Sequence, residues 1–418
     1  MKILWVTNVP INHHKEMLGV GTAQSGGWME ASYLAVENTL EITLGVATVC
    51  NNVDFLKSTK GRHTFYLLPL KGDNNKYDHK NQQNQAEWLK VINDFKPDII
   101  HIWGTENPYG LCALKVAENI PSVIYVQGLM HEIYKHYLDG IDISSQIKNL
   151  SFHDIIRNNF SWLNRKFYKQ SIAIEHEMLT LSNNVIVEND WCANHCSILS
   201  QGVNVFRSYL PVNKCFEDYS WSLDKKVAHT IFTVAGGYPI KGLHVLLHAF
   251  YHVLKEYPES KLRIPGDFSY LTVPWYSISS YGRYINRILN ELNLRDNVIF
   301  LGKLSQNEMA KEMECANVFV MPSNIENHSS SLIEAMLVGV PTISAYVGGV
   351  SYYYRDGING IFYRHDDVES LAMNIINIFN SDDFAYRLSE RSKFDTKEMR
   401  LSIDISKDFV TTYKSIMK

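Results

Sequence analysis

The chain has 418 residues, more than the roughly 250–300 that one hydrophobic core can serve, so at least two domains are expected. Hydrophobic residues make up 45% and charged residues 20%, which excludes a disordered or fibrous protein. Forty Lys and Arg residues against 44 Asp and Glu residues give a net charge of -4, which argues against a dedicated nucleic-acid binder.

Cysteine content and targeting signals indicate the compartment. Six cysteines are too dilute for a disulfide scaffold and form no CxxC pair, so we expect free thiols in a reducing cytoplasm. The apolar run Ile3–Val6 is too short for a signal peptide. No run approaches the roughly 18 apolar residues of a membrane span, so the sequence predicts a soluble chain that can still touch a membrane surface.

Short apolar runs alternate with helical stretches through the first half of the chain. Strands are expected at residues 2–7, 42–49, 98–103, 122–126 and 184–187, with helices at 86–95 and 110–118. This alternation is typical of βαβ units and a parallel sheet.

Residues 129–181 form a predicted helical insertion. Its apolar residues recur at helical spacing: Phe152, Ile155, Ile156, Phe160, Leu163 and Phe167. Trp162 and the basic residues lie largely elsewhere on the helix: Arg157, Arg165, Lys166 and Lys169. One interpretation is a core-facing stripe with a solvated basic face. The other is a surface that meets anionic lipid headgroups or an acidic acceptor.

The alternation restarts in the second half. Strands are expected at residues 229–234, 261–264, 297–301, 318–321 and 341–344, and helices at 244–255, 306–314 and 331–338. The changeover lies near residues 208–228, where Pro211 and the polar stretch 217–226 suggest a linker. The sequence therefore predicts two successive α/β domains followed by a helical tail.

The segment from Met321 to Met336 carries the strongest chemical signal. A strand ends at Met321, a polar loop follows, and a helix begins near Ser330 with serines as natural N-caps. A helix N-terminus at the carboxyl end of a parallel strand binds anions, so the N–H groups of residues 329–332 are expected to contact a phosphate. Glu326 and Glu334 cannot bind phosphate themselves; they suit the hydroxyl groups of a sugar or ribose.

A second strand, turn and helix contains Gly236-Gly237 and, shortly after, Lys241-Gly242. Glycines let a backbone approach a ligand closely, and an ammonium group beside the helix suits a diphosphate. The spacing is not that of a Walker P-loop. The sixteen histidines show no HExxH or comparable spacing, so no metal site is expected.

Glu326 and Glu334, separated by seven residues and followed by Ala335-Met336, resemble the EX7E motif of the retaining glycosyltransferases of family GT4. Neighbouring segments resemble the family in the same order: residues 297–302, 305, 341–344, 347–350 and 355–360. The first of these resembles the strand near the nucleotide base. The resemblance covers residues 230 to 380, and more weakly the first half at Gly26-Gly27 and Asp98–His101.

The resemblance implies a GT-B fold, in which two Rossmann-like domains face each other across a cleft. Residues 1–212 would bind the acceptor, residues 213–395 would bind a nucleotide diphosphate sugar, and the helix at 396–418 would pack back on the first domain. It further implies transfer of a hexosyl group with retention to a glycan or lipid-linked acceptor, in surface polysaccharide synthesis, without a metal or cofactor.

The same resemblance assigns roles to individual residues. Glu326 would bind the donor sugar and Glu334 the ribose. The diphosphate would be held by Lys241 and by the N–H groups of Ser329, Ser330 and Ser331. Further donor contacts would come from His328, Gly236, Gly237 and, from the first domain, Gly26 and Gly27.

Two positions depart from the family. Gly236 stands where the family commonly has an Arg, so one cation for the diphosphate is missing. Gln127 stands where the family often has a His, and a Gln cannot act as an acid or base. These departures motivate one alternative, a catalytically silent nucleotide-sugar binder. Another is a nucleotide-sugar 2-epimerase, which shares the architecture but has no reason for the spacing of Glu326 and Glu334.

Overall fold

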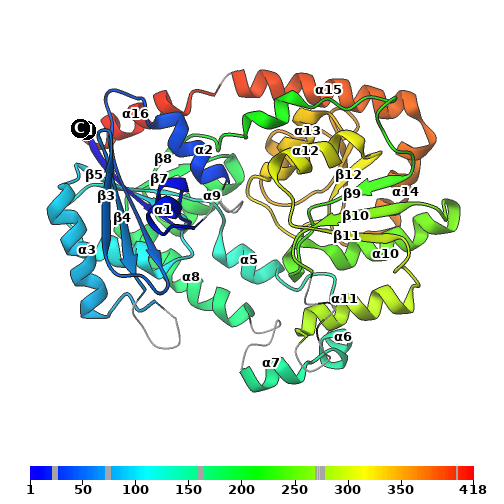
Figure 1. Cartoon of the computed structure of the whole chain (residues 1–418), viewed down its shortest axis with the longest axis horizontal. Coiled ribbons are helices and arrows are strands. Elements are labelled where there is room, and N and C mark those ends of the chain that lie inside the picture. Colours follow the sequence, from blue (N-terminus) through cyan, green and yellow to red (C-terminus); the bar gives the residue numbers. More distant parts are fainter. Residues whose placement is uncertain are drawn as a thin grey trace. The chain divides into compact units, whose positions relative to one another are not determined.

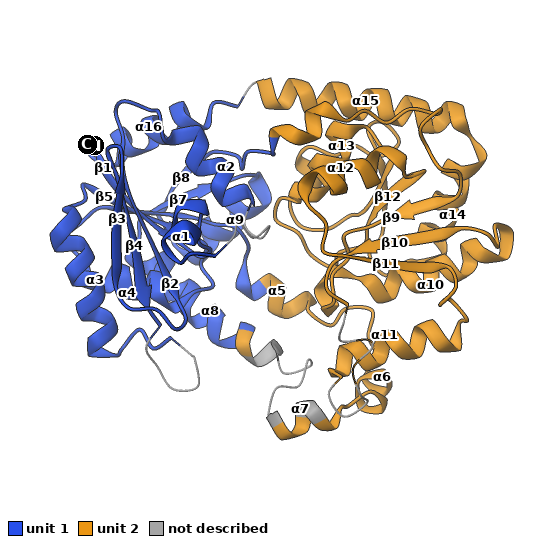
Figure 2. Cartoon of the chain, viewed as in Figure 1, with its two compact units in different colours: residues 1–131, 168–213, 403–418 blue, residues 132–167, 214–402 orange. Residues whose placement is uncertain are grey.

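A computed structural model describes the chain except residues 21–26, 71–76, 158–163, 269–270, 272, 274–277 and 402. The chain forms two compact units (Figure 2). Unit 1 comprises residues 1–131, 168–213 and 403–418, and unit 2 comprises residues 132–167 and 214–402. The contacts thus group residues 132–167 with unit 2, whereas the sequence suggested a first domain that runs unbroken to residue 212.

In the described part of unit 1, eight strands form one sheet in the order β3-β4-β2-β1-β5-β6-β7-β8 (Figure 1). The strands are β1 (Lys2–Thr7), β2 (Thr43–Cys50), β3 (Leu56–Lys60), β4 (His63–Pro69), β5 (Ile99–Trp103), β6 (Ser122–Tyr125), β7 (Asn184–Val187) and β8 (Asn204–Arg207). The pairings are parallel, apart from the antiparallel pair β3–β4. Three of these strands, β3, β4 and β8, were not predicted from the sequence; β3 gives no apolar signal, because this edge strand is mostly polar and exposed.

Both faces of the unit 1 sheet are covered by helices. Along β1, Ile3 and Trp5 belong to one core cluster, and Leu4 and Val6 belong to the other, as the two-residue period of a strand requires. The first cluster includes residues of α2 (Gly27–Val36) and α16 (Ile405–Ile416). The second includes residues of α3 (Gln82–Phe95), α4 (Pro108–Val116) and α9 (Asp190–Leu199). A short helix, α1 (Asn12–Met17), follows β1.

The C-terminal helix α16 is part of the core of unit 1. The hydroxyl of Tyr413 accepts a hydrogen bond from Trp5 Nε1 at 3.1 Å and lies 2.7 Å from Nδ1 of His101. All three side chains are buried, and burial lowers the pKa of His101 to about 3. His101 is therefore neutral and holds the tail helix on the sheet.

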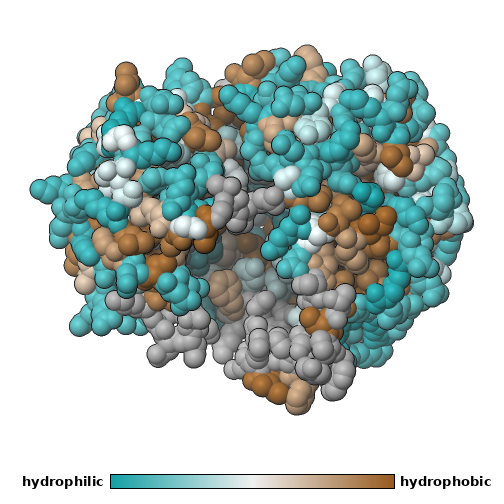
Figure 3. Space-filling view, in the orientation of Figure 1, coloured by the Kyte–Doolittle hydropathy of each residue, from teal (hydrophilic) through white to brown (hydrophobic). Residues whose placement is uncertain are grey.

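The predicted insertion is broken into α5 (Met130–His136), α6 (Ile143–Lys148), α7 (Phe152–Arg157) and α8 (Asn164–Leu181). The side chains of Phe152, Ile155, Ile156 and Phe167 are between 51% and 67% exposed, so a core-facing stripe is wrong for these residues. Figure 3 shows hydrophobic atoms on the surface at the position of α7. Residues 158–163 and the side chains of Arg157, Arg165 and Lys166 lie outside the described part of the chain, and Lys169 is exposed.

In the described part of unit 2, six parallel strands have the order β11-β10-β9-β12-β13-β14 (Figure 1). The strands are β9 (Thr230–Phe232), β10 (Lys261–Pro265), β11 (Val298–Gly302), β12 (Val318–Met321), β13 (Thr342–Ala345) and β14 (Ile361–Tyr363). The helices are α10 (Leu243–Glu256), α11 (Ser280–Glu291), α12 (Gln306–Cys315), α13 (Ser330–Val338), α14 (Val368–Asn380) and α15 (Asp382–Leu401). Helix α10 packs against α11 and α14, and α13 packs against α12 and α15.

The stretch 217–226, expected to be a linker, is fixed to unit 2. Trp221 is buried, its Nε1 donates to the carbonyl of Ala316 at 2.7 Å, and its backbone N–H donates to the carbonyl of Val338. The polar composition of this stretch suggested a linker, but a single large buried side chain, Trp221, is enough to fix a short segment to the unit.

Candidate functional site

The strand order of unit 2 brings the two predicted motifs together. Strand β9 lies between β10 and β12, so the chain leaves β9 and β12 at the point where the strand order reverses. In open parallel sheets, ligands bind at the carboxyl ends of the strands at such a point. The loop after β9 carries Gly236, Gly237 and a 3-10 turn, Pro239–Lys241, and the loop after β12 carries Glu326 and leads into α13.

The two charged residues of these loops are in direct contact. Lys241 Nζ lies 2.6 Å from Glu326 Oε1, and the hydroxyl of Ser323 donates to the same oxygen at 2.7 Å. The Lys241 side chain is 31% exposed and that of Glu326 is 13% exposed. A ligand can therefore reach both an ammonium group for phosphate and a carboxylate for hydroxyls at one place.

Glycines of this site allow neighbouring loops to touch. Gly242 has φ +68, and a Cβ there would lie 1.8 Å from the carbonyl oxygen of Pro322. Gly348 has φ +52, and its Cβ would lie 1.9 Å from the carbonyl oxygen of Glu326. The N–H of Gly349 donates to that same carbonyl at 3.0 Å. A side chain at position 242 or 348 would push the Glu326 loop away, a packing role that the sequence analysis did not foresee.

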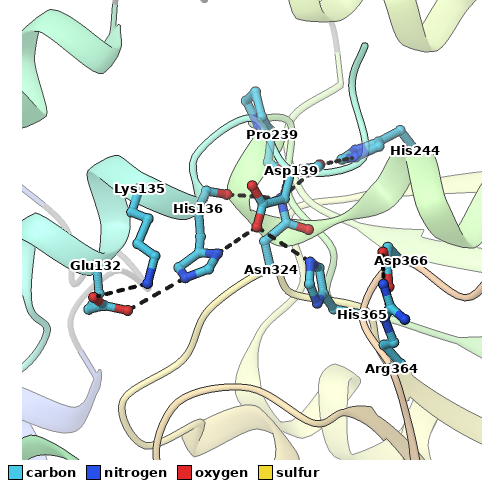
Figure 4. A network of polar contacts seen from close by, with 10 residues as sticks. All are labelled: Glu132, Lys135, His136, Asp139, Pro239, His244, Asn324, Arg364, His365 and Asp366. Carbon is cyan, nitrogen blue, oxygen red and sulfur yellow. Dashed lines mark hydrogen bonds and ion pairs between the residues drawn. The ribbon is translucent and has the colours of Figure 1, made fainter.

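Asn324 ties the two loops to the end of α5, as Figure 4 shows. Its buried Nδ2 lies 3.2 Å from the carbonyl oxygens of both His136 and Asp139, and 3.5 Å from that of Pro239. Its backbone N–H donates to the carbonyl of Ile240 at 2.8 Å. Asn324 thus fixes the loop of Glu326 against the loop of Lys241. This role could not be predicted from the sequence, because nothing in the spacing of Asn324 indicates a structural amide.

Asp139 strengthens the anchor of α5. Its carboxylate lies 2.5 Å from His136 Nδ1 and 3.4 Å from His365 Nε2. Although burial opposes the effect, hydrogen bonds from the two imidazoles lower the pKa of Asp139. The carbonyl of Asp139 also lies 2.9 Å from His244 Nε2. The segment that ends α5 is therefore part of the framework beneath the site.

Helix α13 begins at the site as predicted. Ser329 is the N-cap, and its hydroxyl accepts from the N–H of Leu332 at 3.4 Å, while Ser330 and Ser331 form the first turn. Gly339, with φ +87, ends the helix. Burial lowers the pKa of His328 to about 4, and its ring lies 5.0 Å from that of Tyr353, so His328 is neutral.

Glu334 lies one turn inside α13. Burial raises the pKa of this half-buried carboxyl from 4.5 to about 8. No residue in the described ranges forms an ion pair or hydrogen bond with it. At neutral pH, Glu334 is mostly protonated, so it can both donate to and accept from a hydroxyl, and it does not repel a phosphate nearby.

Gly236 and Gly237 lie in the loop after β9, outside the left-handed region. A Cβ at Gly236 would lie 3.1 Å from Cε1 of Tyr238, whose ring is 45% exposed. Tyr238 thus borders the space into which a side chain at position 236 would extend.

A cavity of about 570 Å³ lies at the carboxyl ends of β10 and β11. Its lining includes Asp267, Phe268, Arg295, Phe300 and Lys303. The rings of Phe268 and Phe300 are 4.5 Å apart. Aromatic rings beside two cations suit a planar, polar ring system such as a nucleotide base.

The site residues predicted for the first domain fall in unit 1. Gly26 lies outside the described residues, and Gly27 is the first residue of α2. Gln127 follows β6, where its Oε1 accepts from Asn8 Nδ2 at 2.7 Å. Asn8 Nδ2 also donates to Glu106 Oε1 at 2.8 Å. The sequence analysis missed Asn8 and Glu106, although both follow predicted strands closely.

Comparison with known proteins agrees with this architecture. Residues 217–394 match the family model of the glycosyl transferases group 1, a range that contains both loops and α13. The chain therefore carries a group 1 glycosyltransferase domain, which makes up most of unit 2. The chain has the GT-B fold, as its structural neighbours do. Among the residues that the structure describes, no helix is both long and apolar enough to span a membrane.

Two curated relatives resemble most of the chain. It is 21% identical over 324 residues to the N-acetyl-alpha-D-glucosaminyl L-malate synthase of Bacillus anthracis, which covers 77% of this chain and 75% of that protein. It is 22% identical over 322 residues to the alpha-monoglucosyldiacylglycerol synthase of Acholeplasma laidlawii, which covers 74% and 73%.

Two solved structures share the fold over nearly the whole chain. Sucrose-phosphate synthase from Thermosynechococcus elongatus superposes with a TM-score of 0.72 at 16% identity, covering 99% of this chain and 98% of that one. HepE of Anabaena, solved in complex with UDP and glucose, superposes with a TM-score of 0.65 at 15% identity, covering 99% and 100%.

Proposed function

We propose that this group 1 glycosyltransferase moves a hexosyl group from a nucleotide diphosphate sugar to a hydroxyl of a glycan or lipid-linked acceptor, with retention and without a metal ion. The observation that carries the proposal is the contact between Lys241 and Glu326 beside the N-terminus of α13. An ammonium group and helix N–H groups suit a diphosphate, and the adjacent carboxylate suits a sugar hydroxyl.

Each part of the donor has a matching feature in unit 2. The base fits the cavity beside Phe268 and Phe300, and the ribose hydroxyls fit Glu334. The diphosphate is neutralised by Lys241 and the first turn of α13, and the sugar hydroxyls meet Glu326. The complex of HepE with UDP and glucose supports a uridine nucleotide as the first donor to test.

The proposed reaction needs no protein base. The bond between the anomeric carbon and the β-phosphate oxygen breaks, and the acceptor oxygen forms its bond to that carbon on the same face. The acceptor proton passes to the departing phosphate oxygen. Lys241 stabilises the charge that develops on this phosphate, a contribution worth about 2–4 kcal/mol for one preorganised donor. The substitution of Gln for the family's His at position 127 is compatible with this route, because no step uses an imidazole.

The first experiment is a thermal-shift panel of UDP, GDP and ADP with their glucose and N-acetylglucosamine conjugates. A nucleotide at tens of times its Kd should stabilise the protein by about 2 kcal/mol. The Glu326→Gln variant should then bind the bare nucleotide with unchanged affinity but lose turnover at least a hundredfold, because its partner is the sugar. A Glu326→Gln variant with wild-type turnover would refute the assignment of Glu326 to the donor sugar.

A silent binder makes a different prediction from the same panel. Its support comes from two departures from the family: Gly236 stands where the family commonly has a cation, and Gln127 stands where it often has a His. Nucleotide-sugar binding without transfer or hydrolysis across all donors would favour that alternative. Turnover with any donor excludes it.

We also propose peripheral contact with the inner face of the membrane and a role in surface polysaccharide synthesis. The exposed side chains of Phe152, Ile155 and Ile156 on α7 support this contact better than the basic residues on which the sequence analysis relied. Replacing the three by Ser should abolish co-sedimentation with phosphatidylglycerol vesicles. Wild-type protein that stays in the supernatant at low salt would refute the idea.

A further inference from the structure

Three polar side chains meet at the carboxyl ends of neighbouring strands in unit 1. Strand β1 lies between β2 and β5, so its end is the point where the order of this sheet reverses, and β6 follows β5. Asn8 follows β1, Glu106 lies just after β5, and Gln127 follows β6 shortly after its end. This place in the sheet corresponds to the donor site of unit 2, with different chemistry.

Hydrogen bonds fix the orientation of Asn8. Its Nδ2 donates to Glu106 Oε1 at 2.8 Å and to Gln127 Oε1 at 2.7 Å, so both N–H bonds of the amide are used. Its Oδ1 is buried and has no hydrogen-bond partner among the described residues. A buried acceptor without a donor is costly, and a hydroxyl of a bound molecule would remove that cost.

The backbone is shaped to hold the carboxylate of Glu106. Gly104 has φ +83, and a Cβ at this position would lie 2.3 Å from Glu106 Oε2. The N–H of Gly104 donates to the carbonyl of Tyr125 at 2.9 Å, which ties this turn to β6. The carboxylate therefore lies over the backbone of its own loop, in a position that only glycine at 104 permits.

The charge of this group is unbalanced. In the described ranges, no Lys, Arg or His forms an ion pair with Glu106. Its carboxylate accepts hydrogen bonds from the amides of Asn8 and Asn107 and from backbone N–H groups of residues 105 and 106. Burial raises the pKa of Glu106, and the nearby carboxylate of Glu175 raises it further, while the hydrogen bond from Asn8 opposes both. A second anion placed here would meet like charge, whereas a neutral hydroxyl would find two acceptors.

We propose that Asn8 and Glu106 form the acceptor subsite of the enzyme, and that this subsite takes a neutral hydroxyl-bearing sugar or polyol and rejects a phosphate or carboxylate. The inference rests on the proposed function, because it assumes transfer from a donor held by unit 2. It adds the chemical class of the acceptor and the residues that select it.

The test compares two sets of acceptors with the nucleotide sugar that turns over in the panel. The neutral set is the methyl glycosides of glucose, galactose, mannose and N-acetylglucosamine, and the anionic set is the 6-phosphates of the same sugars. Wild-type enzyme should use the neutral set. In Glu106→Gln, kcat/KM for neutral acceptors should fall at least tenfold, and the ratio of anionic to neutral kcat/KM should rise at least tenfold, while UDP affinity measured by calorimetry stays within twofold.

Two further variants separate recognition from folding. Asn8→Ala should weaken neutral acceptors without changing the ratio between the two sets, because it removes an acceptor atom but no charge. Glu188→Gln is the matched control: this buried carboxyl of unit 1 also has its pKa raised by burial, to about 8, and it accepts from the N–H of Leu210. The control should leave both sets unchanged.

Wild-type preference for the phosphorylated set, or an unchanged acceptor ratio in Glu106→Gln, would overturn the inference alone. Failure of the wild-type protein to bind any nucleotide sugar would overturn the proposed function and this inference with it.

Discussion

The sharpest prediction concerns Glu334, because its environment sets both the direction and the pH window of the effect. The pKa of this carboxyl is raised by burial from 4.5 to about 8. Between these two values, the folded protein holds a proton that the unfolded chain has released, so raising the pH favours unfolding. In Glu334→Gln, the side chain resembles the protonated acid at every pH, and this penalty disappears.

The magnitude follows from the size of the shift. A rise from 4.5 to about 8, at about 1.4 kcal/mol per pH unit, corresponds to roughly 5 kcal/mol. Because the side chain is only half-buried and water screens it, we expect about 2 kcal/mol. Glu334→Gln should therefore match the wild type below about pH 4.5 and become more stable relative to it as the pH rises, with a constant difference above the folded pKa.

Urea unfolding of both proteins from pH 4.5 to 9 measures this difference. Other titrating groups are common to the two proteins, so their contributions cancel in the comparison. A difference that does not change with pH would refute the burial argument. A variant that loses stability relative to the wild type as the pH rises would show that folding lowers the pKa of Glu334. The same variant should bind UDP more weakly than the wild type, since its amide replaces the carboxyl that we propose for the ribose.

Two further substitutions test the framework of the donor site. Lys241→Ala should raise the activation free energy that kcat/KM reports by about 2–4 kcal/mol. The wild-type rate should be unchanged by EDTA. Loss of activity with EDTA and rescue by Mg²⁺ or Mn²⁺ would show that a metal neutralises the diphosphate. Asn324→Ala should speed hydrogen exchange in residues 236–242 and 322–330 and lower kcat, because the loops of Lys241 and Glu326 lose their common tie. Asn317→Ala is the control. It removes another buried Asn of unit 2, which accepts from the N–H of His229, and it should leave hydrogen exchange in both loops unchanged. Equal effects of the two variants would show that Asn324 contributes only to the stability of the fold.

Part of the donor site could be predicted from local sequence. A strand that ends in a polar loop and then a Ser-capped helix places N–H groups at a strand end whatever the rest of the fold does. Glu326, Glu334 and the first turn of α13 were found for this reason. Gln127 was singled out differently, from the resemblance to a family that often has a His at this position.

Other parts of the site depend on residues that meet only through folding. Asn324 acts through the carbonyls of Pro239, His136 and Asp139, which lie far from it in sequence. Gly242 and Gly348 matter because other loops pass within 2 Å of where a Cβ would stand. No spacing rule relates such partners, since a loop can approach from any distance along the chain.

The amino-acid sequence by itself determined the α/β class, the restart of the pattern in the second half and the two loop motifs that we propose for phosphate, because hydrophobic period and helix capping are local properties of the chain. Only the tertiary structure decided the strand order that sets β9 beside β12, the grouping of residues 132–167 with unit 2, and the exposure of the apolar residues on α7. It also decided the chemistry of Glu106 and Glu334. A carboxyl has one intrinsic pKa in every sequence, and the burial and neighbours that move it are supplied by segments that fold around it.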